Sequence, residues 1–277
     1  MSSNRVVDVR VLEVLKARAT ARRAYELALA MPTEQKAAKD AICLLLWLET
    51  IMGVEVLNTV AAMAPGDTHL AQVVSEASAM YSYVLDGHPP PGPPLEGIPA
   101  IVALCGGGRL VDFRFFRFHK RLVARGVAVI RDNVGALVFD DHLHAMLRRF
   151  EDADANAGGR SSNPRPVPAP ELMAPFVVAK TRTPPEDSRA AFIALPGCHC
   201  HRPSSQEVVN YYEKTLMFGP CIERVETERP GAGQAPKHGI IVFVSAELRD
   251  EAMFEETGVF FRVDGHDTWV QPYMPTL

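Results

Sequence analysis

The residues best suited to metal chemistry are four consecutive side chains, Cys198-His199-Cys200-His201. Thiolate and imidazole are ligands that zinc prefers, but structural zinc sites usually take them from two pairs joined by a longer loop. Neighbouring side chains of an extended segment point to opposite sides, so at most two of the four can reach one ion without a sharp turn. Cys221 could approach from the next predicted strand, but no second pair is near. We therefore expect neither a metal site nor a cofactor.

Cations are concentrated in residues 109–131, where seven basic residues accompany one acid, Asp112. At about 100° per residue, four arginines share one stripe of a helix: Arg114, Arg117, Arg121 and Arg125. A ridge of this kind can bind the phosphates of a nucleic acid. The alternative is a solvated face paired with acids such as Asp132, Asp140 and Glu151, which is the commoner role of a charged run.

The sequence carries no signature of an enzyme. It has no Gly-x-Ser-x-Gly, no His-Glu-x-x-His and no paired-carboxylate pattern. The glycines 106–108 lack a preceding strand and a following Lys-Ser or Lys-Thr, so they do not form a phosphate-binding loop. His142 and His144 stand at the start of a predicted helix. These observations favour a non-enzymatic protein.

Composition places the chain among soluble globular proteins, with 47% hydrophobic and 22% charged residues. Its 277 residues suffice for one large or two ordinary domains. No apolar run approaches the ~18 residues that span a bilayer, and the first residues show no secretory signal. The five cysteines are too few and too scattered for a disulfide framework. We expect a nuclear or cytoplasmic protein that does not enter a membrane.

Periodicity divides the chain into two parts. Apolar residues recur at helical spacing in residues 1–154, which predicts an all-α helical bundle. The expected helices cover residues 6–30, 34–63, 68–85, 97–104, 109–139 and 142–152. Residues 155–187 are rich in Pro, Gly, Ser and Asn, a composition typical of an interdomain linker.

Residues 188–277 change to strand periodicity interrupted by two helical segments. Strands are expected at 191–195, 221–228 and 239–244, and a hairpin at 259–270 turns at Asp264-Gly265. Helices are expected between the first two strands and at 246–256. The order is β-α-β-β-α-β, so the expected fold class is multidomain: a helical bundle followed by an α+β, split-βαβ (ferredoxin-like) domain.

That order, together with two short strings, resembles the RNA recognition motif (RRM). The string 238–245 (HGIIVFVS) lies where the family has its RNP1 strand, and 191–196 (AFIALP) lies where it has RNP2. The final Trp269-Val270 resembles the end of the family's last hairpin. The likeness covers about the last third of the chain. The overall layout is similar to plant proteins that join a helical domain to a degenerate RRM, a likeness that implies no activity.

The resemblance implies a sheet face on which aromatic side chains stack on RNA bases. Phe192 occupies the aromatic RNP2 position and should point out of the sheet, and His238 occupies the leading basic position of RNP1. Ile240 and Val242 occupy its two aromatic positions but offer no stacking face, and each missing platform forfeits ~1–3 kcal/mol per base. Two residues of the last strand could compensate: Trp269 and Tyr273.

Two functions follow. The first is binding of RNA or another single-stranded nucleic acid, with bases on the sheet and phosphates on the arginine stripe. The second is a protein-interaction adaptor in which the aliphatic sheet face binds a peptide or packs on the helical domain. The net charge of −4 comes from residues 188–277, so the RRM-like part itself offers no basic surface in bulk.

Overall fold

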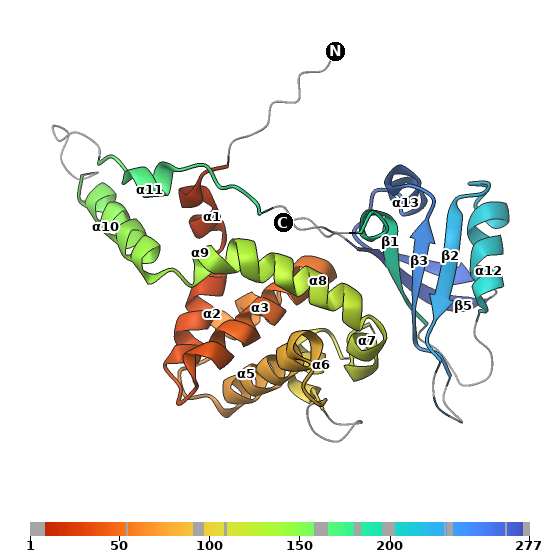
Figure 1. The fold of residues 1–277 in the computed structure, drawn as a ribbon, viewed down its shortest axis with the longest axis horizontal. Coiled ribbons are helices and arrows are strands. Elements are labelled where there is room, and N and C mark those ends of the chain that lie inside the picture. The colour runs from red at the N-terminus through yellow and green to blue at the C-terminus, as the bar shows by residue number, and fades with distance from the viewer. Residues whose placement is uncertain are drawn as a thin grey trace, which may run out of the picture.

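The computed structural model describes residues 9–53, 55–90, 97–107, 110–157, 166–179, 184–195, 203–229, 231, 235–263 and 265–273. The N-terminal half is helical, and the C-terminal part contains a five-stranded antiparallel sheet with helices (Figure 1). The change from helical to strand periodicity is confirmed. None of the described helices is long and apolar enough to cross a membrane.

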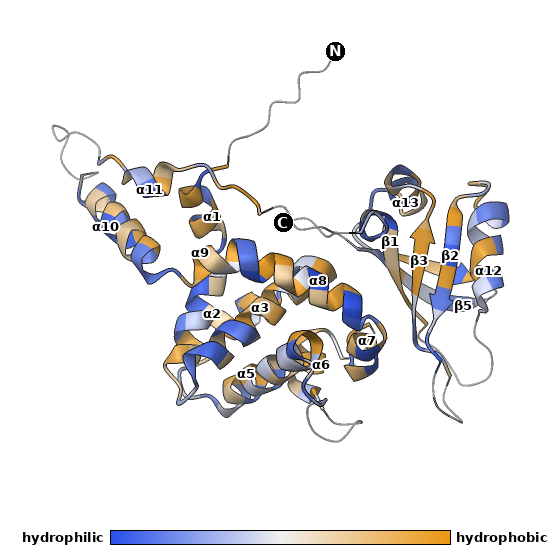
Figure 2. Cartoon of the chain, viewed as in Figure 1, coloured by the Kyte–Doolittle hydropathy of each residue, from blue (hydrophilic) through white to orange (hydrophobic). Residues whose placement is uncertain are grey.

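The helical half is built around one buried helix. Its described helices are α1 (Val11–Ala17), α2 (Ala19–Leu29), α3 (Gln35–Met52), α4 (Val56–Ala61), α5 (Thr68–Tyr81), α6 (Pro99–Leu104), α7 (Phe113–Phe118), α8 (Lys120–Ile130), α9 (Ala136–Val138) and α10 (Asp141–Ala157). Every residue of α3 from Ala41 to Leu48 is buried. By contrast α8 is amphipathic, and its ribbon alternates between hydrophilic and hydrophobic colours (Figure 2).

Three predicted helices are each divided in the structure. The expected helix 6–30 is divided at Arg18, between α1 and α2. The expected helix 34–63 stops at Gly53, whose φ of +61° favours glycine and whose N–H bonds to the carbonyl of Glu49. The expected helix 109–139 starts only at Phe113, because the Asp112 carboxylate accepts the N–H of Phe115 at 2.9 Å as an N-terminal cap. It is interrupted again at His119, which separates α7 from α8.

Part of the predicted linker 155–187 packs on the helical half. The short helix α11 (Pro170–Met173) buries Leu172 completely in a small core with Leu15 and Leu147. The N–H of Phe176 bonds to the carbonyl of Val9 at 2.7 Å. The average composition of residues 155–187 did not predict this packing, because one apolar side chain and a few backbone hydrogen bonds are enough to fix a short stretch.

The sheet has the strand order β2-β3-β1-β5-β4, and all its neighbours are antiparallel. Its strands are β1 (Ala190–Ala194), β2 (Ile222–Thr227), β3 (His238–Phe243), β4 (Val259–Val263) and β5 (His266–Pro272), and its helices are α12 (Ser205–Asn210) and α13 (Ala246–Ala252). Ser204 and Ser245 cap these helices with their hydroxyls. The expected strands and both helices are confirmed to within a few residues.

The two faces of β1 belong to two different cores. Ala191 and Ile193 pack with Val208 of α12 and with Tyr212, which follows it. Phe192, one residue out of phase, belongs to the large core of the helical half. The sheet lies beside the α7 end of that half (Figure 1). One continuous core therefore joins the two parts of the chain.

Candidate nucleic-acid interface

Phe192 points out of the sheet, but the helical half covers it. The side chain is fully buried, with its ring centroid 5.2 Å from that of Phe115, 4.8 Å from His119 and 5.6 Å from Tyr273. The direction expected from the RNP2 position is correct, whereas the expected exposure is not. A base cannot stack on a ring whose faces are already occupied by α7 and β5.

Tyr273 is also buried, beside Trp47 of α3 and Gly126 of α8. A Cβ added at Gly126 would lie 2.2 Å from the indole nitrogen of Trp47 and 2.9 Å from the Tyr273 hydroxyl. The contact requires glycine in the middle of a helix, where that residue is otherwise unfavourable. Burial raises the pKa of Tyr273. Tyr273 thus joins the helical half to the sheet part of the chain and is not available for stacking on a base.

His238 is fully buried and faces the start of α7. Its Nε2 lies 2.8 Å from Oδ1 of Asp112, and the Lys237 ammonium lies 2.5 Å from Oδ2 of the same carboxylate. Burial opposes the charged form of Asp112, but the contacts with His238 and Lys237 outweigh it and hold the pKa of Asp112 well below its usual range. His238, expected at the leading basic position of RNP1, therefore contacts the residue that caps a helix.

Ile240 and Val242 follow His238 on the same face of β3. Val242 is buried, while Ile240 is partly buried against the large core. The adaptor alternative has this aliphatic face bind a peptide or pack on the helical domain. Both residues line a cleft with residues of α7 and α8. Helices α7 and α8 of the same chain therefore cover this face of β3.

Trp269 differs from the other sheet residues. It is partly buried and lies near the outer edge of the sheet, where its ring contacts Phe260 of β4 with centroids 4.5 Å apart. A Cβ added at Gly258 would lie 2.3 Å from the Trp269 ring, so glycine also leaves room for the indole. Trp269 nevertheless packs against the large core that contains Phe192 and Tyr273, so it too lies on the covered face of the sheet.

The arginine stripe faces the sheet part of the chain. Arg114 makes a bidentate pair with the buried Glu228, at 2.9 and 2.6 Å, and Arg117 contacts the same carboxylate at 3.2 Å. Arg125 makes a second bidentate pair with the buried Asp187, at 2.8 and 2.6 Å. Burial works against the charge of Glu228, yet Arg114 outweighs it and lowers the pKa of that carboxyl. These arginines primarily join the two parts.

Arg121 is the exception in that stripe. It is exposed and has no ion-pair partner among the residues that the structure describes. Lys120, beside it, lies with its ammonium 4.0 Å from the centre of the Tyr83 ring. Both residues line the cleft that also borders Ile240 and Val242. Among the described residues, neither Lys120 nor Arg121 forms an ion pair, so both cations are available to bind an anion.

The cleft has a volume of about 740 Å³ and separates α7 and α8 from strands β2 and β3. Its lining includes five cations and three acids: Arg117, Lys120, Arg121, Arg125, Arg224, Glu186, Asp187 and Glu226. Arg224 pairs with Glu186 at 2.7 Å and with Glu226 at 2.8 Å, so the exposed acids of the cleft already have a cationic partner. The lining as a whole is therefore positive.

His119 lies at the inner side of this cleft. It is 4% exposed, and its Nε2 has no hydrogen-bond partner within the described part of the chain. Burial, together with the nearby His238, holds the pKa of His119 well below its usual range, so the ring is neutral near neutral pH. Sequence reasoning missed His119 and Arg224, since neither lies in a motif, and it counted Lys120 only among the seven basic residues of the segment 109–131. Their only signal was proximity to the arginine stripe or to a predicted strand.

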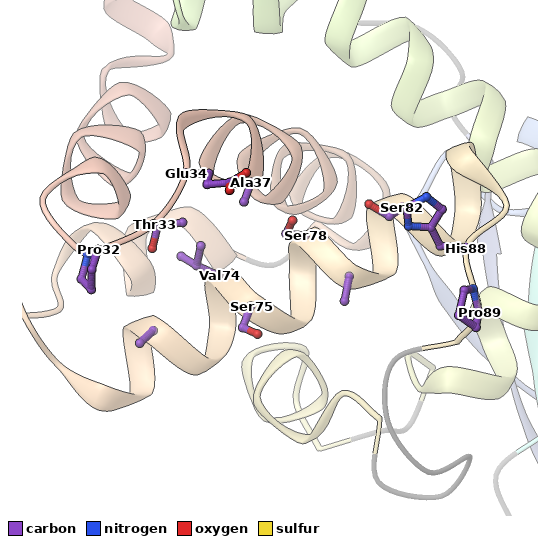
Figure 3. A pocket seen from close by; sticks show the side chains of 12 residues that line it. Pro32, Thr33, Glu34, Ala37, Val74, Ser75, Ser78, Ser82, His88 and Pro89 are labelled. Atoms are coloured by element: carbon purple, nitrogen blue, oxygen red, sulfur yellow. The ribbon is translucent and has the colours of Figure 1, made fainter.

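A separate cavity of about 510 Å³ lies between the start of α3 and α5. Figure 3 shows the hydroxyls of Ser75 and Ser78 on α5 and of Ser82 directly after it, with His88 at one end and Glu34 opposite. The residues that line it include no lysine or arginine, so it does not suit a phosphate. The cleft beside α7 and α8 remains the better candidate.

Metal ligands play no part in either region. The cluster Cys198–His201 lies outside the residues that the structure describes. Among those that it does describe, no group of three or more Cys, His, Asp or Glu side chains could hold an ion. Cys221 is a buried thiol whose pKa is raised by burial.

Comparison with known proteins adds no relative to this picture. No protein-family description, no curated protein and no solved structure matches the chain.

Proposed function

We propose that the protein binds single-stranded nucleic acid, and RNA in particular, through the cleft between α7–α8 and the sheet. The observation that carries this proposal is the positive lining of that cleft, in which Arg121 has no ion-pair partner among the described residues. Phosphates would lie along Arg121, Lys120 and the half-exposed Arg117. The function is binding without catalysis.

The RRM-like nature of the C-terminal part belongs to the same proposal. The elements follow the order β1-α12-β2-β3-α13-β5, with β4 as an added edge strand, and β1 and β3 are neighbours in the sheet. This order agrees with a split-βαβ unit. In such a unit RNA would normally lie on the face of Phe192, but α7 and α8 occupy that position here. We therefore propose that the RNA lies along the border of the sheet face that α7 and α8 cover.

The cleft suits a flexible single strand better than a duplex. Apolar surface from Phe118 and Ile240 borders its cations, and a base turned out of its stack can contact such surface. Few phosphates are bound, because Arg114 and Arg125 are already saturated by carboxylates. For two or three phosphate contacts on a single strand, log K should fall with log salt with a slope of about 0.7 per contact. Binding should be weak and independent of sequence.

The test is salt-dependent binding of the full chain to a random single-stranded RNA pool. Arg121→Ala and Lys120→Ala should each weaken binding for all sequences alike and reduce the salt slope by about 0.7. Arg148→Ala is the matched control, because Arg148 is exposed on α10 and does not line the cleft. Equal effects of Arg121→Ala and Arg148→Ala, or no binding at low salt, would contradict the proposal.

A second candidate is the protein-interaction adaptor. The burial of Phe192 and Tyr273 favours it, since a sheet face sealed by helices has lost the platform on which RRMs stack bases. The C-terminal part would then serve as a scaffold fixed to the helical half. Absence of RNA binding at low salt, where the electrostatic contribution is strongest, would make this function the leading one.

A further inference from the structure

Strand β4 forms an open edge of the sheet. It pairs with β5 on one side, and no described strand pairs with it on the other. In an antiparallel ladder alternate residues direct their N–H and C=O groups to the same neighbour, so half of the backbone groups of β4 face this edge. Proteins usually blunt such edges, because they pair readily with another strand.

Exposed aromatic side chains lie on both sides of this edge. On one face Phe260 is 57% exposed, and it contacts Trp269 of β5 on its inner side. On the other face Phe254 is 56% exposed, with its ring 6.3 Å from that of Phe261. Phe254 has a φ of +54°, a conformation that is strained for a side chain of this size. A strained backbone that holds an aromatic ring in water suggests a contact surface.

We infer that β4 pairs with β4 of a second copy of this chain, in an antiparallel arrangement centred on Phe261. The side chains of β4 are self-complementary in this register. Phe260 and Arg262 lie on the same face of the strand, two residues apart, so Phe260 of each copy lies opposite Arg262 of the other. Each pair places an exposed guanidinium over an exposed ring.

Other registers fit less well. The arrangement centred on Phe261 pairs all five residues of β4, and Val259 then lies opposite Val263. A shift by two residues in one direction would set the two copies of Arg262 opposite each other, which like charges disfavour. A shift in the other direction would leave Arg262 opposite Gly258 and remove the cation–aromatic contact. Two-fold self-complementarity is the usual basis of homodimers.

The contact that anchors the helical half is set back from this edge. Phe192, which anchors that half, lies on β1, and β5 separates β1 from β4. With strands ~4.8 Å apart, the anchor lies about two strand spacings inside the edge. The interface is short, so the dimer should form only at high protein concentration. It does not depend on RNA binding, because the cleft borders β2 and β3 at the opposite side of the sheet.

Sedimentation velocity of the full chain over a range of concentrations tests the inference. The wild type should shift from the 30.4 kDa monomer to a dimer as concentration rises. Phe260→Lys places a cation opposite Arg262 and should abolish the shift. Combining Phe260→Lys with Arg262→Glu should restore it, since the new pairs are then oppositely charged only in the register centred on Phe261. Val177→Lys, at a residue 78% exposed in the segment after α11, is the control and should dimerise normally.

Three outcomes would overturn the inference: a wild type that stays monomeric, a dimer that Phe260→Lys does not affect, or no restoration in the combined variant. Circular dichroism establishes that each variant is folded. If Phe260→Lys does not fold, the dissociation constant of the dimer formed by Arg262→Glu serves as the test. Loss of both cation–aromatic contacts should weaken dimerisation by roughly 5- to 30-fold, and an unchanged dissociation constant would contradict the proposed register.

Discussion

The ring of Phe192 on β1 lies nearly perpendicular to the ring of His119, with centroids 4.8 Å apart and an angle of 81° between the ring planes. One residue comes from the sheet and the other from the junction of α7 and α8. The contact occurs where an RRM would offer its RNP2 aromatic to a base. It shows that the helical half and the sheet part share one core. A substitution in this core should therefore change the stability of both parts.

Phe192→Ala should destabilise the whole protein. The ring is fully buried in the joint core, so its loss should cost about 3–5 kcal/mol of unfolding free energy. Chemical denaturation monitored by circular dichroism measures this change. Phe260→Ala, at an exposed aromatic on β4, is the control and should change stability by no more than ~0.5 kcal/mol in the monomer. A small effect of Phe192→Ala would show that the interface is loose.

Glu228→Gln should weaken the attachment of the sheet to α7. The carboxylate is 4% exposed and receives Arg114, Arg117 and the Lys237 backbone N–H. Because Arg114 and Arg117 remain partly in contact with water, the expected loss is about 1–3 kcal/mol, below that of a fully buried pair. Thermal unfolding with Glu226→Gln as the exposed control measures it. Equal midpoints for the two variants would contradict the structural role of Glu228.

Acid should destabilise the protein through His119. Burial lowers the folded-state pKa of His119 far below its usual 6.5, so only the unfolded chain binds this proton as the pH falls. Stability should therefore decrease below about pH 6.5 by up to ~1.4 kcal/mol per pH unit for this one group. The neighbouring His238 and Asp112 face the same region, and Asp112, with its lowered pKa, loses its contribution only at much lower pH.

His119→Gln checks the assignment, because glutamine does not titrate. The variant should lose stability at pH 7 but show a shallower decrease between pH 7 and 5 than the wild type. Denaturant unfolding at a series of pH values provides the comparison. His142→Gln, at an exposed histidine of α10, is the matched control and should keep the wild-type slope. An unchanged slope in His119→Gln would refute the role of this residue.

Gly126→Ala should destabilise the protein, although alanine is the better helix former by ~1 kcal/mol. The added Cβ would meet the Trp47 indole nitrogen at 2.2 Å and the Tyr273 hydroxyl at 2.9 Å, so α8 must move away from α3 and β5. Trp47→Phe in the same chain removes the indole nitrogen and should recover part of the loss. Thermal unfolding of the single and combined variants measures both effects. A stabilised Gly126→Ala would show that the contact is less close than described.

The periodicity of the sequence alone determined most of the elements. Short apolar and β-branched runs indicated β1, β3 and the β4–β5 hairpin, whereas the expected direction of Phe192 out of the sheet followed from the resemblance to RNP2. Helical spacing likewise placed Arg114, Arg117 and Arg125 on one stripe. The boundaries within the helical half were less predictable, because Gly53 and Asp112 end and begin helices through local backbone geometry. Each of these boundaries depends on a single residue and its backbone conformation, which the spacing of apolar residues does not report.

Only the tertiary structure decided what covers the sheet and what the arginines contact. Arg114 and Glu228 are 114 positions apart, and Asp112 and His238 are 126 positions apart. Periodicity tells which face of an element is apolar or charged, but not which distant element meets that face. Tight packing of Phe192 against α7, and the low cost of a buried carboxylate once an arginine reaches it, arise only when both parts are folded together.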